Sequence, residues 1–153
     1  MDIRTAGIND IEAIRIFYED FFAHNASQQP EYYKKANSYP DYPISVVRSN
    51  DADILAAEEN GCLIGFVHVE MGQTPPYETF VPHKFASVID LYVEPSSRGI
   101  GAGSMLLSSA AKWAKTRGAD YIELNVLTEN ENALRLYEKL GYKIVSHIMR
   151  SKI

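Results

Sequence analysis

The spacing of apolar positions changes several times along the chain, and the changes predict a succession of strands and helices. Residues 2–6 alternate in the manner of a short first strand. After a candidate capping residue, Asn9 or Asp10, apolar residues recur at helical spacing: Ile11, Ile14, Tyr18, Phe21 and Phe22. Because amphipathic helices bury their apolar stripe, we expect this aromatic face to belong to the core rather than to a ligand site.

Residues 25–50 lack such a pattern. Prolines interrupt any long element there, and tyrosines crowd the segment: Pro30, Pro40, Pro43, Tyr32, Tyr33, Tyr39 and Tyr42. A short helix is expected over residues 31–37. The segment is aromatic and long enough to line a pocket, as irregular stretches of more than about 12 residues often do.

The next apolar runs predict a hairpin and a further strand. Residues 54–59 and 63–71 read as strands joined by Asn60-Gly61, a dipeptide typical of turns with φ > 0 at both central positions. A proline-containing loop over residues 72–84 is a second candidate pocket lid. Residues 85–93 then form a strand that leads into a glycine-rich turn.

The last third alternates helix and strand. The helix after the glycine turn has small and apolar residues on one side and ends near Arg117-Gly118, a basic residue and a C-cap glycine. A strand over residues 121–127, a helix over 130–140 closed by Gly141 and a last strand over 142–149 follow. With no repeat or linker in view, we expect one α/β domain with a mixed sheet over residues 1–153.

Composition narrows the class of protein. The chain has 153 residues, 46% hydrophobic and 23% charged, as ordinary globular domains have. No apolar run approaches the ~20 residues of a membrane span, and residues 1–6 do not resemble a secretion signal. The single cysteine, Cys62, excludes an internal disulfide and fits a reducing compartment. These features predict a cytoplasmic protein without a membrane partner.

The net charge of −5 bears on partners. Lysine and arginine do not cluster into a stripe, so nucleic acid is not an expected partner. A mildly acidic protein suits a cationic substrate such as an amine, although solubility accounts equally well for a charge of this size.

The most specific local feature is the glycine-rich turn between the strand ending at Val93 and the next helix. Gly99, Gly101 and Gly103 stand at alternate positions. Glycines allow close backbone approach and φ > 0, while the first turn of a helix offers unpaired N–H groups and a dipole that favours an anion. The turn therefore predicts a phosphate-bearing ligand.

Two known glycine-rich phosphate-binding motifs match the sequence of this turn poorly. The P-loop requires a lysine that this turn lacks. The dinucleotide fingerprint comes closer, because Gly99-x-Gly101 is followed by Ser104, and Glu123 lies where a ribose-binding acid belongs. However, only about 30 residues follow Glu123, whereas the dinucleotide fold uses two such halves. A nucleotide-dependent oxidoreductase remains the weaker enzymatic alternative.

Two separate motifs carry a family resemblance. The pattern Arg98-x-x-Gly101-x-Gly103 resembles the acetyl-CoA loop of the GNAT superfamily of N-acetyltransferases. Downstream, a second segment is similar to that family's Asn-x-x-Ala-x-x-x-Tyr-x-x-x-Gly-Phe/Tyr pattern, through Asn130, Ala133, Tyr137, Gly141 and Tyr142. The resemblance extends from about residue 54 to the C-terminus.

The resemblance implies a fold and a reaction. The fold is α/β (α+β), with a central mixed, mostly antiparallel sheet that splays near its middle and helices on both faces. The implied activity is that of an acyltransferase that moves an acetyl group directly from acetyl-CoA, as co-substrate and without a metal, to an amine of a small molecule or peptide. Members of the family often form homodimers.

The implied ligand contacts fall into three groups. Backbone N–H groups of the glycine turn suit the coenzyme pyrophosphate, and Arg98 adds a charge-assisted contact. By resemblance, the pantetheine arm lies along the preceding strand, where a backbone N–H near Tyr92 or Val93 forms an oxyanion hole. The expected coenzyme contacts are Leu91, Tyr92, Val93, Arg98, Gly99, Ile100, Gly101, Ala102, Gly103, Ser104, Asn130, Ala133 and Tyr137.

Tyr137 is the one residue with an expected catalytic role. A tyrosine with a pKa of ~10 is protonated at neutral pH and can donate to a departing thiolate, which is the role the family gives its matching tyrosine. Asn130 is also a candidate N-cap. A non-catalytic acyl-CoA sensor is the main alternative of another class, although a mere binding module has no need of an acid at position 137.

The general base stays open between several groups. An amine arrives protonated and must lose a proton before it attacks. Glu70 and His68 share one face of a predicted strand, and Asp90 and Glu94 lie near the glycine turn. Any of these four, or a water molecule, could accept the proton. Cys62 is not expected to carry the acyl group, because it adjoins the hairpin turn without a recognisable histidine partner.

Overall fold

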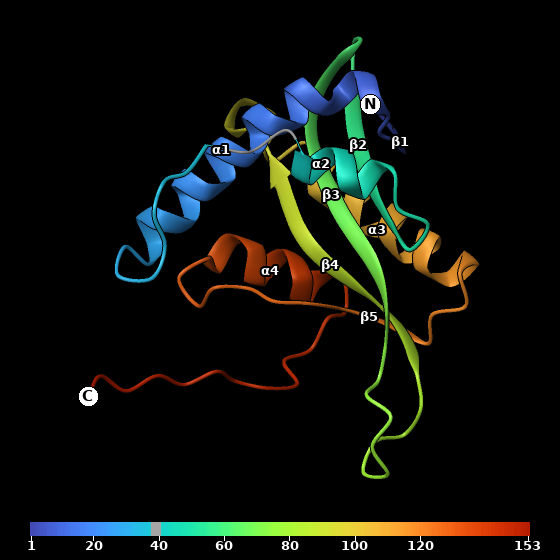
Figure 1. Ribbon diagram of the computed structural model, residues 1–153. Coiled ribbons are helices and arrows are strands. Elements are labelled where there is room, and N and C mark those ends of the chain that lie inside the picture. Colours follow the sequence, from blue (N-terminus) through green and yellow to red (C-terminus); the bar gives the residue numbers. More distant parts are fainter. Residues whose placement is uncertain (38–40) are drawn as a thin grey trace.

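The computed structural model describes residues 1–37 and 41–153, and in these residues five strands form one sheet (Figure 1). The sheet order is β1-β2-β3-β4-β5. Strands β1 to β4 pair antiparallel, and β5 is parallel to β4. The strands are β1 (Asp2–Thr5), β2 (Ala52–Glu59), β3 (Cys62–Gln73), β4 (Lys84–Val93) and β5 (Tyr121–Leu124). The expected mixed, mostly antiparallel sheet is confirmed.

Helices cover both faces of this sheet (Figure 1). α1 (Ile11–Gln28) and α2 (Asp41–Val47) pack on one face, and α3 (Ala102–Thr116) packs on the other. α4 (Glu131–Lys139) lies beyond β5, and single turns of 3₁₀-helix precede α1 and α3, η1 (Ile8–Asp10) and η2 (Pro95–Ser97).

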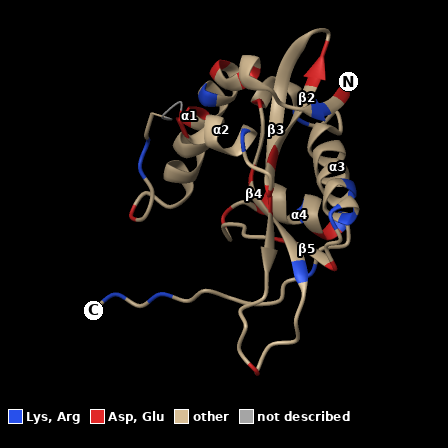
Figure 2. Ribbon diagram, turned by 45° about the vertical axis from the view of Figure 1, so that its right-hand side comes forward, with Lys and Arg blue, Asp and Glu red and all other residues tan. Residues whose placement is uncertain are grey.

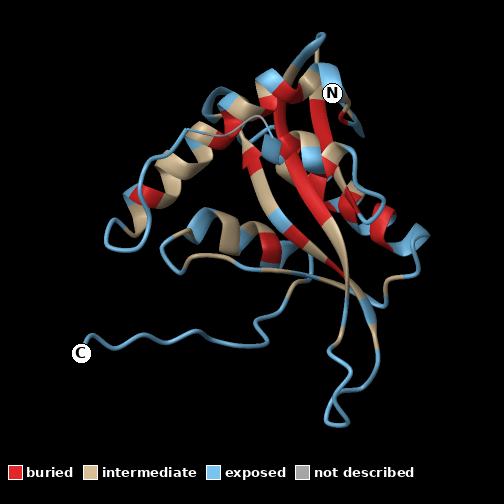
Figure 3. Ribbon diagram, viewed as in Figure 1, coloured by how far each residue is buried: buried red, intermediate tan, exposed pale blue. Residues whose placement is uncertain are grey.

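The sheet separates two hydrophobic cores, and the buried positions follow its central strands (Figure 3). The α1-side core contains the aromatic face expected of the first helix, with Ile14 and Tyr18 fully buried beside Phe66 of β3. The α3-side core gathers apolar residues of β2, β3 and β4 against Leu106 and Leu107 of α3. Successive side chains of one strand point alternately into the two cores, because side chains of a strand alternate between its two faces.

Two turn predictions are confirmed. Asn60 and Gly61 have φ values of 51° and 80°, so the hairpin uses positive φ at both central residues. The C-cap glycines also behave as expected, because Gly118 and Gly141 adopt φ values of 79° and 89°.

The irregular segment differs from prediction. Residues 33–37 form no helix, whereas α2 begins at Asp41, and Pro43 lies in its first turn. Proline is tolerated there because the first N–H groups of a helix have no partner to lose. Pro40 and Tyr39, which were part of the expectation, lie outside the described residues.

The expected last strand is also wrong. Residues 142–149 have no regular structure, and β5 ends at Leu124 rather than at residue 127. The segment has the β-branched composition of a strand, but it leaves α4 as an extended chain (Figure 1), and the residues after it contact the segment that follows α1, where Lys152 Nζ is 2.9 Å from Glu31 Oε1. Strand propensity reflects the fit to a pleated, half-buried surface, and in the described residues this segment pairs with no strand, although β5 has a free edge.

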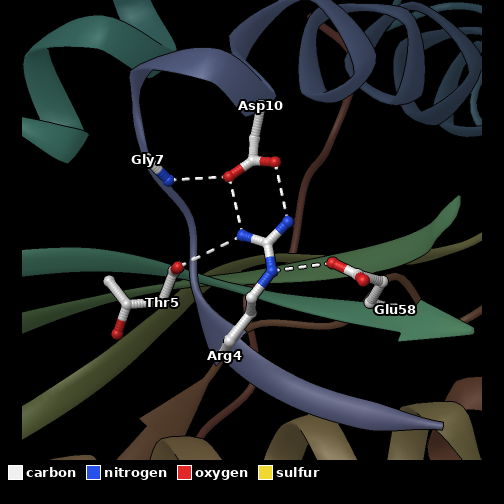
Figure 4. A network of polar contacts seen from close by, with 5 residues as sticks. All are labelled: Arg4, Thr5, Gly7, Asp10 and Glu58. Atoms are coloured by element: carbon white, nitrogen blue, oxygen red, sulfur yellow. Dashed lines mark hydrogen bonds and ion pairs between the residues drawn. The ribbon is translucent and has the colours of Figure 1, made fainter. Parts of the chain in front are cut away.

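A polar network fixes the entry to α1 (Figure 4). The Asp10 carboxylate accepts two hydrogen bonds from the Arg4 guanidinium, at 2.8 and 2.9 Å, and one from Gly7 N–H at 2.7 Å. Arg4 also donates to Glu58 of β2 at 2.7 Å. Asp10 therefore ties β1 to the start of α1 instead of capping the helix through its side chain.

Candidate active site

Strand β4 contains a β-bulge at the point where the sheet opens. In the pairing of β3 with β4, Ile89 is an extra residue between Val88 and Asp90. The pairing of β4 with β5 ends at Val88 and Leu124, so the two irregularities coincide. Beyond them, in the described part of the chain, β4 runs on to Val93 without a strand on its β5 side. This is the expected splay, and it leaves backbone polar groups free for a ligand.

The bulge also determines which face of the sheet the side chains after Ile89 occupy. Tyr92 enters the α1-side core, while Leu91 and Val93 pack against the α3-side core. The Tyr92 hydroxyl donates to Asp20 of α1 at 3.1 Å. Burial, aided by that hydrogen bond, raises the pKa of Tyr92 to about 12. The end of β4 is thus anchored on both faces while its edge stays open.

The glycine turn holds two residues in the left-handed conformation. Gly99 and Gly101 have φ values of 82° and 96°, and a Cβ built on either would meet no atom within 4 Å. Glycine is therefore needed for backbone conformation rather than for space. Gly101 is the N-cap of α3, and no side chain caps this helix. Its first N–H groups, at Ala102, Gly103 and Ser104, are therefore available to an anion.

Arg98 lies across the end of β4. Its side chain is exposed, and Nε donates to the Val93 carbonyl at 2.9 Å. The guanidinium carbon lies 6.0 Å from the centre of the Tyr92 ring. Arg98 thus places a positive charge between the open strand edge and the glycine turn, next to the exposed Ile100.

The two sequence motifs meet in space. A Cβ built on Gly103 of α3 would stand 3.2 Å from Leu136 Cδ2 of α4. α4 itself begins as expected, because the Asn130 side chain accepts a hydrogen bond from Ala133 N–H at 3.2 Å. The packing of α3 on α4 therefore brings the second motif to the start of the helix that the first motif opens.

Tyr137 lies one turn beyond Ala133 and is only 8% exposed. Its ring centre is 5.8 Å from that of Tyr142. Burial, reinforced by Tyr142, raises the pKa of Tyr137 to about 12, so the hydroxyl is protonated at neutral pH. No described residue forms a hydrogen bond with this hydroxyl, which leaves its proton available to a ligand.

Three of the four candidate bases lie together on the α1 side of the sheet, where Figure 2 shows acidic positions on β3 and β4. His68 is fully buried, and its Nε2 is 2.9 Å from Glu70 Oε1 but poorly aligned for a hydrogen bond. Its Nδ1 is 3.2 Å from Tyr42 Oη and 3.7 Å from Asp90 Oδ2. We name these four residues, Tyr42, His68, Glu70 and Asp90, the His68 cluster.

The sequence did not single out two tyrosines that complete this environment. Tyr42 donates to Asp90 at 3.5 Å, and burial together with the Asp90 charge raises its pKa to about 12. Tyr18 packs edge-on to Tyr42 at 5.4 Å, and its buried hydroxyl has no partner in the described residues. Burial, with a smaller contribution from Asp90, raises the pKa of Tyr18. The available signal was the crowding of tyrosines in residues 32–42 for Tyr42 and the aromatic face of the first helix for Tyr18.

The fourth candidate base is engaged elsewhere. Glu94 Oε1 accepts hydrogen bonds from the hydroxyls of Ser96 and Ser97, both at 2.9 Å, and so stabilises the turn that precedes Arg98. Cys62 is exposed at the start of β3. Of the four candidate bases, Glu94 is therefore the one that lies apart from the His68 cluster and is engaged in a turn.

Other features of the described residues lie outside this site. An open depression of about 370 Å³ is lined in part by Asn50, Met71, Lys84 and Arg117, and Asn50 and Lys84 belong to the two segments that were expected to line or cover a pocket. No group of three or more His, Cys, Asp or Glu side chains in residues 1–37 and 41–153 is placed to hold a metal ion. None of the helices described is both long and apolar enough to cross a membrane.

Comparison with known proteins identifies the class to which this fold and site correspond. The model of the Acetyltransferase (GNAT) family matches residues 11–142. The chain therefore belongs to the GNAT acetyltransferase family, as its two motifs predicted. The match extends from the start of α1 to just beyond α4. It therefore includes the open strand edge, the glycine turn and Tyr137.

Relatives of known name are also acetyltransferases by name. The chain is 31% identical to an uncharacterized N-acetyltransferase, YhfO, of Bacillus subtilis over 94% of its own length and 90% of the relative's. It is 29% identical to an uncharacterized N-acetyltransferase, MJ1207, of Methanocaldococcus jannaschii over 83% of its own length, but it spans only 55% of that protein. A mycothiol acetyltransferase of Thermomonospora curvata is 34% identical over 60% of this chain and 28% of the relative.

Solved structures share the fold. A variant of the Bacillus halodurans protein BH1408 superposes with a TM-score of 0.94 at 22% identity, over 100% of this chain and 99% of that one. The aminoglycoside N-acetyltransferase AAC(6')-Iy, solved in complex with CoA, gives a TM-score of 0.75 at 14% identity, over 99% and 98% of the two chains.

Proposed function

We propose that this protein is an acetyl-CoA-dependent N-acetyltransferase that moves an acetyl group directly to a primary amine of a small molecule or peptide. The observation that carries the proposal is the contact of Gly103 with Leu136, which joins the uncapped start of α3 to the helix of Tyr137. An anion-binding backbone and a protonated tyrosine thus lie beside one open strand edge.

The coenzyme binds through backbone groups in this proposal. Free N–H groups at the start of α3 and in the turn from Gly99 suit a pyrophosphate, and the helix dipole adds to the attraction. Arg98 is placed to add a charge-assisted hydrogen bond. The amide-rich pantetheine arm pairs with β4 from Ile89 to Val93, where β5 has diverged, in the manner of an added strand. Asn130 and Ala133, at the start of α4, add contacts to the coenzyme in this proposal.

The chemical step needs stabilisation of charge on the thioester oxygen. Glu94 N–H donates to Ile64 of β3 at 3.0 Å, so the backbone N–H of Tyr92 also faces β3 and that of Val93 faces the open edge. The Val93 N–H can donate to the thioester oxygen as negative charge develops. Such a donor is typically worth about 3 kcal/mol when it is aimed at the transition state. The anchoring of Tyr92 to Asp20 keeps the strand end rigid, which is what preorganised donors require.

Two proton transfers are assigned to opposite sides of the sheet. The His68 cluster accepts the proton that the ammonium group must lose before its nitrogen attacks the carbonyl carbon. Tyr137 donates its proton to the thiolate as the C–S bond breaks. The nitrogen loses a second proton when the tetrahedral intermediate collapses to the amide, and this proton restores the Tyr137 hydroxyl through solvent. A tyrosine with a pKa of about 12 is fully protonated at neutral pH and can act as this acid.

The acceptor approaches from the α1 side in this proposal, because the His68 cluster faces α1 and α2. The protein's net charge of −5 and the carboxylates of Glu70 and Asp90 suit a cationic amine. Residues 1–153 act as one N-acetyltransferase domain, and the segments around α2 and the β3–β4 loop select the acceptor.

Ligand binding followed by turnover tests the proposal. At about 100 times its dissociation constant, acetyl-CoA should stabilise the protein by about 2.7 kcal/mol, which raises Tm by roughly 5–10 °C for a domain of this size. NAD at the same concentration is the control and should have no effect. Release of free thiol from acetyl-CoA is then measured over a panel of primary amines.

The outcomes separate the alternatives. Stabilisation by acetyl-CoA with amine-dependent thiol release supports the transferase. Stabilisation without turnover on any amine would favour a non-catalytic acyl-CoA sensor. Stabilisation by NAD alone would sink the proposal in favour of an oxidoreductase.

A further inference from the structure

The open depression of about 370 Å³ lies at the end of β4 that is away from the glycine turn. Its volume falls at the lower end of the range of small-molecule sites. We name it the α3-end depression. Its lining comes from four elements: Asn50 and Asp51 before β2, Met71 to Gln73 of β3, Lys84 of β4 and Arg117 after α3. None of these residues has a part in the proposed acetyl transfer.

Strand β3 has an unpaired backbone edge at this place. β2 begins at Ala52, opposite Glu70, whereas β3 continues to Gln73 (Figure 1). The last hydrogen bond on this side runs from Met71 N–H to the Asp51 carbonyl at 2.7 Å. Backbone groups of an antiparallel strand alternate between its two neighbours, so Gln73 N–H points to the same side as Met71 N–H. In the described part of the chain it has no acceptor, and it is therefore available to a ligand.

Arg117 is held in a fixed orientation beside this edge. Its Nη2 donates to Asp53 Oδ2 at 2.9 Å, and its guanidinium carbon lies 4.0 Å from the centre of the Trp113 ring. Trp113 Nε1 donates to the same Asp53 oxygen at 2.6 Å. No described residue accepts a hydrogen bond from Arg117 Nε or Nη1. A guanidinium that is already oriented loses little freedom when it binds a carboxylate through two parallel hydrogen bonds.

The charges around the depression select the kind of ligand. Lys84 and Asp51 have no ion-pair partner among the described residues. They come from opposite sides of β3, whose two neighbouring strands are about 10 Å apart. Asp53 offsets the charge of Arg117, so the four groups sum to zero. A multiply charged anion such as phosphate would meet the Asp51 carboxylate, whereas a molecule with one carboxylate and one ammonium group matches both sides.

We propose that the α3-end depression binds a free α-amino acid at a site separate from the acetyl-transfer site. The carboxylate of the ligand accepts hydrogen bonds from Arg117, Lys84 and the backbone N–H of Gln73. Its ammonium group donates to the Asp51 carboxylate. The side chain of the ligand lies in the open mouth of the depression. This binding does not depend on the proposed acetyl transfer.

Nuclear magnetic resonance of the ¹⁵N-labelled full chain, without acetyl-CoA, is the first test. Each of the twenty L-amino acids is added singly at millimolar concentration. At least one should shift the Gln73 backbone signal and the Arg117 Nε signal in a saturable manner. Acetate and methylammonium each lack one of the two charged groups and should bind about tenfold more weakly or worse. The proposal is overturned if no amino acid shifts these two signals, or if acetate binds as tightly as the best amino acid.

Charge-removing variants locate the site. Lys84→Gln and Asp51→Asn alter exposed side chains, so the fold should survive, and each should raise the Kd of the amino acid about tenfold. Lys115→Gln is the matched control, because Lys115 is an exposed lysine in the last turn of α3 that does not line the depression. An unchanged Kd in the first two variants, or an equal rise in the control, would contradict the assignment.

The position of the shifted signals separates this site from binding of an acceptor amine. An amino acid is itself an amine, and binding at the His68 cluster would shift the signals of residues 68–70 and 90 and persist in Lys84→Gln. Shifts confined to those residues would overturn the α3-end site and leave the proposed acetyl transfer standing. Saturable shifts at Gln73 and Arg117 that weaken in Lys84→Gln support the site even if no amine is acetylated.

Discussion

Gly103 and Leu136 approach so closely that a Cβ on Gly103 would stand 3.2 Å from the Leu136 Cδ2 atom. Gly103 has an ordinary helical backbone, so the glycine serves the packing of α3 on α4 rather than a special φ. The contact couples the position of Tyr137 to the start of α3. A larger residue at 103 should therefore disturb coenzyme binding through the packing of two helices.

Gly103→Val tests this coupling. The added methyl groups force Leu136 and α4 outward, which costs about 1–3 kcal/mol as overpacking does. We expect a lower Tm and a several-fold higher KM for acetyl-CoA. Ser108→Val, at an exposed position of the same helix, controls for the effect of valine on helix propensity. Equal KM values in the two variants would show that the close approach does not matter to the coenzyme.

Gly101→Ala and Gly118→Ala form a matched pair. Both glycines have positive φ, 96° and 79°, and open space around a built Cβ. Each substitution should cost about 1–2 kcal/mol of backbone strain, seen as similar falls in Tm. Only Gly101 lies in the proposed phosphate cradle, so only its variant should raise the KM for acetyl-CoA. A similar KM change at Gly118 would trace the effect to stability alone.

Tyr137→Phe should lower kcat about 100-fold while KM for acetyl-CoA stays within twofold, because a general acid contributes mainly to the transition state. Tyr142→Phe removes the neighbouring hydroxyl and is the control. An unchanged kcat in the Tyr137 variant would remove the assigned role.

The raised pKa of Tyr137 also makes a pH prediction. An acid must be protonated to act, so activity that depends on it is lost only as pH rises through its pKa of about 12. We expect kcat of the wild type to show no decline between pH 8 and about pH 10. A decline near pH 9 would mean that another group supplies the proton.

Substitutions in the His68 cluster should act on the acceptor side. Glu70→Gln removes a carboxylate whose side chain is 45% exposed, so the fold should survive. Together with His68→Gln, it should lower kcat at least tenfold and leave the KM for acetyl-CoA within twofold. His83→Gln, at an exposed histidine paired with Asp120, is the control. A rise in coenzyme KM without a loss of kcat would place the cluster outside the chemistry.

Asp10→Asn should reduce stability by about 1 kcal/mol at neutral pH, since the amide is uncharged and offers one acceptor oxygen where the carboxylate offers two to Arg4 and Gly7. The Arg4 hydrogen bonds, opposed by partial burial, hold the pKa of Asp10 below its usual value of about 3.9. Its stabilisation is thus present above that value and lost as pH falls through the lower folded pKa.

The difference in unfolding free energy between wild type and Asp10→Asn should consequently persist from pH 7 to about pH 5 and shrink below pH 4. Denaturant titrations at several pH values measure it. Glu12→Gln is the control, because Glu12 is an exposed partner of Arg15 on the surface of α1. A difference that grows on acidification would contradict the assigned sign.

Local signals were sufficient for much of the fold. The Asn60-Gly61 turn, the glycines at the ends of α3 and α4 and the Asn130 cap depend on the backbone preferences of one or two residues, and each appeared as expected. The two GNAT motifs are also local. The contact between them, at Gly103 and Leu136, depends on how two helices pack, which residue spacing alone does not specify.

The features that sequence did not predict depend on partners distant in the chain. The bulge at Ile89 exists only in relation to β3, and no residue type marks it. Tyr42 joins His68 because a short helix starts at Asp41 despite Pro43. The expected strand over residues 142–149 has the right composition, but in the described residues this segment pairs with no other strand, although the outer edge of β5 is unpaired.

The sheet keeps the two cores apart, and this has a consequence for how the protein could diversify. Substitutions in Phe17 or Val46 alter the α1-side core, while substitutions in Leu106 or Leu107 alter the α3-side core. The two sets touch mainly through backbone pairing, so their effects should be close to additive. Repacking of the α1-side core could thus change the specificity for the proposed acceptor while the proposed binding site for the acetyl donor stays the same.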